Sequence, residues 1–247
     1  MLWLVAIILV IRTVRPVMGM AFLTVAIGGQ SLAALGRQVS AHAPRWNALR
    51  YIPRVPGRLG GLVRKNLREM LSVLDVYVAA LLSAGGLLYR LAVPHPDRTA
   101  FPILALVIGL SMSTYAQCLF GLDLSASATT RYRLLPLRGW EVLLAKDVPF
   151  LGVLAMLVAP HHLWSGLAFG LTATAIGHHP SLVAPVPLQR WRFTGSRMFP
   201  GVVQAVAGVA VGFGEVQNGV SFLVLSAVLY LASLWFYGRY WDSQRVE

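Results

Sequence analysis

Long runs without Asp, Glu, Lys or Arg constrain this chain more than any other feature. Residues 101–122 form the cleanest run, and the others cover residues 17–36, 76–89, 148–163, 164–177, 201–214 and 219–238. A helix needs about 20 apolar residues to cross a bilayer, and only helices or closed barrels satisfy backbone hydrogen bonds in lipid. The period-two alternation of barrel strands is absent. With residues 1–11 as a half-length first segment, the runs predict an all-α transmembrane bundle of about eight membrane segments.

The composition excludes an ordinary soluble domain. Hydrophobic residues make up 57% of the chain and charged residues only 12%, about half the charged share of a typical globular domain. The 21 Lys and Arg against 9 Asp and Glu give a net charge of +12. A soluble protein this basic would suggest nucleic acid, but basic cytoplasmic loops explain the excess in a membrane protein. We therefore expect no nucleic-acid partner. The single cysteine, Cys118, excludes an internal disulfide.

The positive charge is concentrated in three predicted loops, residues 37–75, 123–147 and 177–200. Basic loops stay in the cytoplasm, so we expect a multi-pass protein of the bacterial cytoplasmic membrane whose carboxyl terminus is cytoplasmic. The predicted organisation is two membrane segments in residues 1–36, a basic cytoplasmic linker in 37–75, a six-helix core in 76–238 and a tail in 239–247.

The chain lacks the signatures of several catalytic classes. A phosphate-binding P-loop ends in Gly-Lys-Ser/Thr, but Lys65 precedes Asn66 and Lys146 precedes Asp147. ATP hydrolysis would therefore belong to a separate subunit, and we predict no catalytic residue, metal site or cofactor in this chain. No acid or base is expected in the middle of any confident span.

Two histidine pairs flank one predicted helix, and we expect a tight turn at Pro160, His161 and His162. The pair at residues 161–162 and the pair at residues 178–179 lie roughly 20–25 Å apart along that helix, at 1.5 Å per residue. They cannot share a metal, so interfacial hydrogen bonding is the expected role.

Small and weakly polar residues mark several spans. Small residues recur at four-residue spacing, which permits close helix packing and favours partner helices: Gly166 and Gly170, Ala173 and Gly177, Gly208 and Gly212, Ala210 and Gly214. The 101–122 run contains Ser113, Thr114 and Gln117. Mild polarity without charge suits a helix that faces a wet interior, so these three residues are a candidate substrate path.

The linker ends in a predicted amphipathic helix at residues 61–75. Its apolar face includes Val63, Leu67 and Leu71, and its basic face includes Arg64, Lys65 and Arg68. Such a helix lies in the membrane interface, with its cations near anionic lipid head groups. A plain juxtamembrane anchor explains the pattern equally well.

The loop at residues 123–147 contains an apolar motif with basic flanks. Pro136 cannot continue a helix and biases its predecessor towards extended geometry, so we expect a short cytoplasmic elbow with exposed leucines. Exposed apolar groups rimmed by Arg predict a docking surface. Its residues are Arg131, Arg133, Leu134, Leu135, Pro136, Leu137 and Arg138.

Residues 131–147 resemble the first cytoplasmic loop of type-2 ABC exporter permeases. Residues 61–74 are similar to the connecting helix of that family, and residues 181–200 to a later loop, whereas His178 and His179 replace the Gly-Asn that the family often has. The resemblance covers roughly residues 50–238 and matches the C-terminal half of the longer permeases. It implies a separate ABC ATPase subunit that binds ATP and Mg²⁺ and docks at residues 123–146. It also implies a second permease core, in a homodimer or a paired permease.

Two other classes of function stay open at this point. The same small-residue packing would suit a non-transporting assembly or regulatory membrane protein. The histidine pairs would suit a His-dependent intramembrane enzyme, although no metalloprotease HExxH motif accompanies them. The transported substrate cannot be derived from the sequence.

Overall fold

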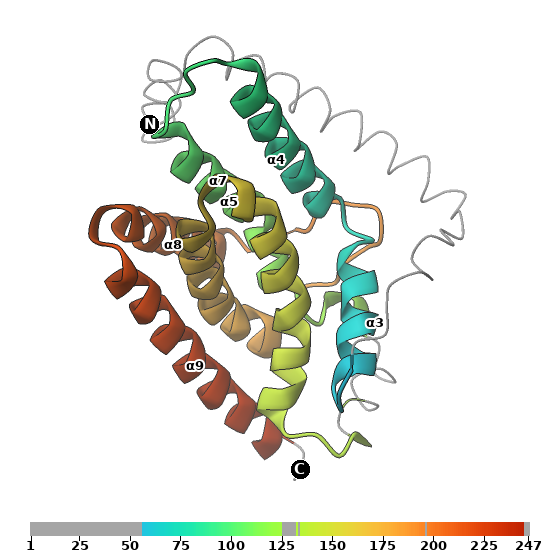
Figure 1. Ribbon diagram of the computed structural model, residues 1–247. Coiled ribbons are helices and arrows are strands. Elements are labelled where there is room, and N and C mark those ends of the chain that lie inside the picture. Colours follow the sequence, from blue (N-terminus) through green and yellow to red (C-terminus); the bar gives the residue numbers. More distant parts are fainter. Residues whose placement is uncertain (1–55, 125–131, 133, 196, 245–247) are drawn as a thin grey trace.

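The computed structural model describes residues 56–124, 132, 134–195 and 197–244, and within these ranges the chain is helical and has no strand. The elements are α3 (Gly60–Met70), α4 (Leu74–Ala92), α5 (Ala100–Ala116), the short 3-10 turn η2 (Gly121–Asp123), α7 (Gly139–Val183), α8 (Met198–Asn218) and α9 (Val220–Ser243). Figure 1 shows α9 running diagonally along the lower-left edge of the bundle, with α3 at the right.

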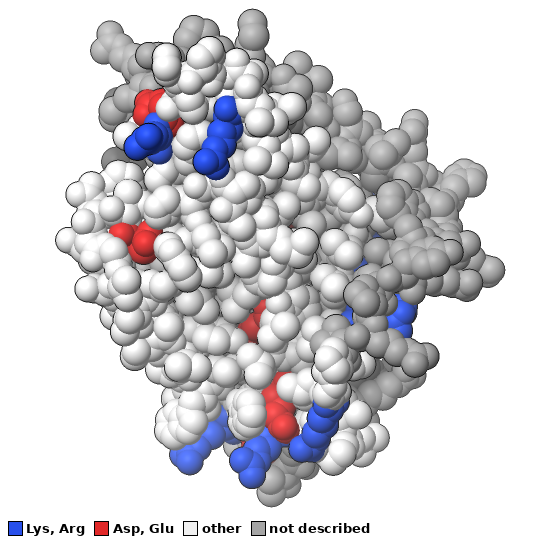
Figure 2. All heavy atoms as spheres, viewed as in Figure 1, with Lys and Arg blue, Asp and Glu red and all other residues white. Residues whose placement is uncertain are grey.

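The helices confirm the prediction of an α-helical membrane bundle. Five helical stretches are long and apolar enough to cross a membrane: α4, α5 with the turn that follows it, α7, α8 and α9. In Figure 2 the Lys and Arg atoms lie at the top and in the lower part of the visible face, and the broad surface between them is white apart from red patches of Asp and Glu. The predicted segments at residues 1–11 and 17–36 lie outside the described residues, so the count of eight stays a prediction.

Helix α7 is a hairpin with two antiparallel arms. His162 has non-helical backbone angles (φ −152°, ψ 93°) and separates the arms. Gly166 lies against Val158 and Gly170 against Leu154, so residues on either side of the kink face one another. The turn predicted at residues 160–162 is confirmed. Each arm is about 30 Å long at 1.5 Å per residue.

Two helix boundaries differ from the sequence prediction. α7 begins at Gly139, well before the charge-free run that starts at Val148, so Lys146 and Asp147 lie about two turns inside it. Both charges lie near the base of the first arm, so the expectation that no acid or base lies in the middle of a span stays a prediction. α3 ends at Met70 instead of running on into the next span, because Val73 is extended (φ −108°, ψ 139°).

The connection after α7 holds the break between α3 and α4 in place. The backbone N–H of Leu74 donates to the carbonyl of Arg192 (3.2 Å), and that of Trp191 donates to the carbonyl of Ser72 (2.6 Å). Thr194 donates to the buried carboxylate of Asp75 through both its backbone N–H and its hydroxyl. A connection distant in sequence thus fixes the angle at which α4 leaves α3.

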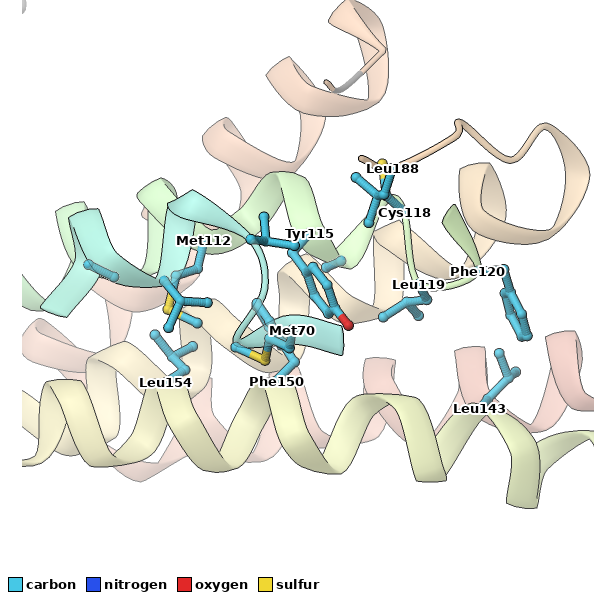
Figure 3. Packing of buried hydrophobic residues seen from close by; sticks show 14 of the residues in the cluster. Met70, Met112, Tyr115, Cys118, Leu119, Phe120, Leu143, Phe150, Leu154 and Leu188 are labelled. Carbon is cyan, nitrogen blue, oxygen red and sulfur yellow. The ribbon is translucent and has the colours of Figure 1, made fainter. Parts of the chain in front are cut away.

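The apolar core lies where α3, α5 and the first arm of α7 meet. Met70 of α3, Met112 of α5, and Phe150 and Leu154 of α7 have no exposed surface. Figure 3 shows these side chains converging, with the ring of Tyr115 among them. Tyr115 and Phe150 stack with their ring centroids 6.3 Å apart.

The small-residue stripes pack within this chain. A Cβ on Gly177 would lie 2.3 Å from the carbonyl oxygen of Ala116, and one on Gly208 would lie 2.7 Å from the ring of Phe169. Gly212 meets Leu106 in the same way. These glycines let α5, α7 and α8 approach one another, so the predicted close packing of the stripes is confirmed within this chain, and the stripes by themselves do not require a partner chain.

Candidate functional site

The elbow (residues 134–138) lies directly before α7. Leu134 is 78% exposed and Leu135 is 37% exposed, whereas Leu137 is buried in the core. Pro136 and Arg138 are exposed. The predicted docking surface is therefore apolar and accessible at its first two leucines, and Leu137 anchors it. Arg131 and Arg133 lie outside the described residues.

Contacts with α3 and α7 hold the elbow in a fixed position. The guanidinium of Arg58, just before α3, donates to the carbonyl of Pro136. Arg58 also lies 3.7 Å from the carboxylate of Glu141. Glu141 in turn accepts a hydrogen bond from the backbone N–H of Arg138 (2.7 Å), which caps the start of α7.

The end of α9 holds the start of α7. The backbone N–H of Gly139 donates to Asp242 (2.8 Å), and a Cβ on Gly139 would lie 2.1 Å from the carbonyl oxygen of Gly238. A Cβ on Gly238 would lie 2.7 Å from the backbone nitrogen of Trp140. Two glycines are therefore required where the backbones of α7 and α9 touch, as Figure 1 shows at the bottom of the bundle.

A buried lysine lies two turns further along α7. Lys146 is 2% exposed, and its ammonium lies 2.8 Å from Asp123 after α5 and 3.9 Å from Glu69 of α3. It also lies over the rings of Phe120 and Tyr132, at 4.8 and 5.1 Å from their centroids. A buried ammonium needs such partners, because an unpaired charge in a low-dielectric interior is costly.

Lys65 completes this ionic cluster, which consists of Lys65, Glu69, Asp123 and Lys146. Its ammonium lies 2.7 Å from Asp123 and 2.8 Å from Glu69. The hydroxyl of Tyr132 donates to Asp123 (2.8 Å). Two cations and two carboxylates balance, so α3, α5 and α7 meet without net charge. Burial raises the pKa of the Tyr132 phenol above its ordinary value, and the nearby carboxylate of Asp123 raises it further.

A second buried polar cluster joins the two arms of α7 to α9. Nε2 of His178 lies 3.0 Å from Oδ2 of Asp147, and neither side chain has exposed surface. Tyr230 of α9 donates its hydroxyl to the same oxygen (3.0 Å). The hydroxyl of Ser233 donates to the carbonyl of Ala175 (2.7 Å), so Nδ1 of His178 must carry a proton to bond the Ser233 oxygen (2.8 Å).

This hydrogen-bond arrangement requires one further proton between Asp147 and His178. With Nδ1 protonated, a proton on Nε2 gives an imidazolium facing a carboxylate, and a proton on Asp147 gives a neutral pair. The sum of charges is zero in both cases. Ser233, His178 and Asp147 are residue types that a hydrolase would use, but His178 is wholly buried. The cluster therefore joins the two arms of α7 to α9 in the interior of the protein, where a substrate could not reach His178.

Of the predicted substrate-path residues, Ser113 and Gln117 are buried and Thr114 is half-buried, and all three bond protein groups. Ser113 donates to the carbonyl of Leu110 in its own helix (2.9 Å), and Thr114 donates to Asp75 (3.2 Å). The side-chain amide of Gln117 donates to that of Gln204, which donates to the carbonyl of Ala173 (2.6 Å). These bonds tie α5 to α4 and α8, and α8 to α7.

The predicted interface helix is divided between core and surface. Val63 is 9% exposed and lies in the core, and Leu71 packs against it. Arg64, Leu67 and Arg68 are half-buried. Lys65, predicted to face lipid head groups, makes the carboxylate contacts of the ionic cluster. The lipid-facing role of this helix stays a prediction.

The predicted histidine pairs divide into buried and peripheral residues. His162, at the kink, contacts Ser165 (2.9 Å) and lies 3.5 Å from Glu215 of α8. Exposed His179 contacts the hydroxyl of Tyr237 (3.0 Å). Among the described residues, no group of three or more His, Cys, Asp and Glu side chains could hold a metal ion.

Sequence reasoning missed both buried polar clusters. Their members come from segments far apart in the chain, and the only local signal was the adjacent Lys146 and Asp147 in a region of helical composition. Comparisons with family models, curated proteins and solved structures found no match. From its helices, the chain is a multi-pass α-helical membrane protein.

Proposed function

We propose that this chain is the transmembrane permease subunit of an ATP-driven, ABC-type exporter. A separate cytoplasmic ATPase subunit binds ATP and Mg²⁺ and docks on the elbow. The chain sits in the bacterial cytoplasmic membrane with its carboxyl terminus in the cytoplasm.

The observation that carries this proposal is an exposed apolar elbow on a rigid base. Leu134 and Leu135 are accessible, while Arg58, Glu141 and Asp242 hold the backbone on either side of them. The ionic cluster lies two turns away and includes residues of α3 and α7. A displacement of the elbow would therefore move α3, α7 and α9 together. A partner that drives helix movement needs such a connection.

The charge distribution supports the same proposal. The chain carries 21 Lys and Arg and has no Gly-Lys-Ser/Thr sequence, so an energy source would come from another polypeptide. The basic stretches flank α3, the elbow and the end of α9. The positive-inside rule favours the cytoplasm for that end of the bundle, which is where an ATPase would reach it.

A second permease core is part of this proposal. In the apolar windows of α8 and α9, only 22% and 17% of residues are buried, compared with 67% in α5. α8 and α9 thus offer outward surfaces that lipid or another core would cover. We propose that residues 76–238 form a six-helix core that pairs with a second copy or with a related subunit.

The test is co-purification of an ATPase with elbow variants. Burying one leucine contributes about 1.5–3 kcal/mol, so Leu134→Asp and Leu135→Asp are expected to weaken docking by roughly ten- to a hundredfold. Arg138→Ala is the matched control, because an exposed ion pair contributes about 0–1 kcal/mol. ATPase recovery and stimulated ATP hydrolysis are measured at equal membrane abundance.

Undiminished recovery and stimulation in both leucine variants would remove the elbow as the coupling surface. If the purified chain forms a defined oligomer and neither it nor its elbow variants ever recover an ATPase, the assembly or regulatory function replaces the transporter.

A further inference from the structure

A cationic pocket lies at the opposite end of α7 from the elbow. It has a volume of about 580 Å³ and opens between the α4–α5 connection and the kink of α7. Its lining includes Arg90, His95, Arg98, Phe101 and His161. His161 comes from the hairpin tip, about 30 Å along α7 from the elbow at 1.5 Å per residue. The pocket is therefore separate from the proposed docking surface.

Contacts within the protein hold the side chain of Arg90 in place. Its guanidinium donates to the carbonyl of Pro160 (2.8 Å) and lies 5.6 Å from the ring centroid of Phe101. Phe101 in turn stacks on His161, with the centroids 6.2 Å apart and the ring planes within 9°. A guanidinium has five N–H donors, and one bond to a carbonyl leaves donors for an anion.

The charges around the pocket do not cancel. Among the described residues, no carboxylate lies within 4.0 Å of the charged nitrogens of Arg90 or Arg98. The acid in the connection, Asp97, accepts hydrogen bonds from the backbone N–H (3.0 Å) and hydroxyl (2.8 Å) of Thr99. Counting only the described residues of the α4 end and the α4–α5 connection, two guanidiniums against one carboxylate leave a net charge of +1 with neutral histidines.

The surroundings of the pocket indicate what kind of anion fits it. Leu87 is 38% exposed and lies one turn before Arg90 on the same side of α4, and Leu91, four residues after Leu87, is 83% exposed. Exposed leucines beside an arginine are typical of the boundary between acyl chains and head groups. Guanidinium binds phosphate through paired N–H donors. We propose that this pocket binds the phosphate of an anionic phospholipid, whose acyl chains follow Leu87 and Leu91.

A phospholipid head group and a free phosphate ion would both present a phosphate oxyanion to the two guanidiniums, so either could in principle occupy the pocket. The exposed leucines favour the lipid, since a free ion would gain nothing from them. Zwitterionic phosphatidylcholine has the same phosphate, but its choline cation would lie beside two guanidiniums. We therefore expect the pocket to prefer phosphatidylglycerol.

The test is lipid binding by the purified full chain in detergent, measured by native mass spectrometry. Phosphatidylglycerol, phosphatidylcholine and inorganic phosphate are titrated separately. We expect one saturable phosphatidylglycerol site, at least tenfold weaker in Arg90→Gln/Arg98→Gln. Arg98→Gln alone is expected to weaken it severalfold, and it leaves the Pro160 contact intact. Arg239→Gln is the matched control, because Arg239 is exposed and lies 4.3 Å over the Trp235 ring, away from the pocket.

Equal phosphatidylglycerol binding by the wild-type chain and the double variant would overturn the proposal, as would equal binding of phosphatidylcholine. Inorganic phosphate that binds with the same dependence on Arg90 and Arg98, without a phosphatidylglycerol site, would overturn the lipid as the source. None of these outcomes depends on an ATPase partner. The lipid-binding test can therefore contradict this pocket without contradicting the proposed transporter function, and the reverse also holds.

Discussion

Asp147 and His178 lie 3.0 Å apart, on opposite arms of one helical hairpin, and neither has any exposed surface. The contact closes the hairpin at its open end, because the kink is at His162 and both residues lie far from it. Tyr230 and Ser233 of α9 bond the same two side chains. A single polar cluster thus fixes both arms of α7 to the last helix of the bundle.

Breaking this pair should destabilise the bundle strongly. Removing one partner costs about 3–5 kcal/mol for a buried ion pair and about 1–3 kcal/mol for a buried neutral hydrogen-bonded pair. In either protonation state, Asp147→Ala and His178→Ala should therefore each lower the midpoint of thermal unfolding in detergent. The double variant should lose less than the sum of the two, because the residues interact directly. His179→Ala is the control, since His179 is exposed. Additive losses would show that the two residues act independently.

The two lysines of the ionic cluster should differ in their contribution to stability. The side chain of Lys146 is 2% exposed and that of Lys65 is 43% exposed. Lys146→Ala leaves Asp123 without its buried partner, so a loss of about 3–5 kcal/mol is expected. Lys65→Ala removes a partly solvated pair worth about 0–1 kcal/mol. Equal shifts of the unfolding midpoint in the two variants would contradict the burial argument.

The glycine contact between α7 and α9 should not tolerate a side chain. Gly139→Ala would place a Cβ 2.1 Å from the Gly238 carbonyl oxygen, and backbone cannot move aside as a flexible side chain can. We expect a loss of about 1–3 kcal/mol or more. Gly152→Ala is the control on the same helix, because no atom lies within 4 Å of its Cβ position. It should be neutral or stabilising by about 0.5–1 kcal/mol. The readout is thermal unfolding of both variants in one detergent.

Membrane topology can be read by cysteine labelling at exposed positions. Asp97 and Asn218 lie in the connections that should be external, and Arg192 and Ser243 at sites that should be cytoplasmic. Single cysteines are introduced after replacement of buried Cys118 by alanine. Labelling of intact cells with an impermeant maleimide should modify only the first two sites. Modification of Arg192→Cys from outside would reverse the orientation.

The membrane helices were predictable because their signal is local. Charge-free runs mark where backbone can lie in lipid, and Pro160 with its two following histidines marks the turn of α7. The start of α7 was not predictable in this way. The charge-free run begins only at Val148, because Lys146 and Asp147 precede it and an isolated charge is costly in lipid. In the structure these two charges have partners: Asp147 pairs with His178, and Lys146 pairs with Asp123.

The candidate site was predictable only in part, for the same reason. Exposed Leu134 and Leu135 follow from the Pro136 break, which is a local effect. The burial of Leu137 depends on the core that α7 and α9 build around it, and the polar contacts of Gln117 depend on Gln204. Contacts between residues so far apart in the chain leave no periodic pattern to read.

The contact of Gly139 with Gly238 joins the backbones of α7 and α9 at the base of the first arm of α7. The first arm extends about 30 Å from this point to the hairpin tip, at 1.5 Å per residue. By the same geometry, a rotation of about 10° at the base displaces the tip by roughly 5 Å, close to one helical turn. Because Lys146 and Asp147 tie this arm to α3, to the turn after α5 and to α9, such a rotation would carry those elements with it.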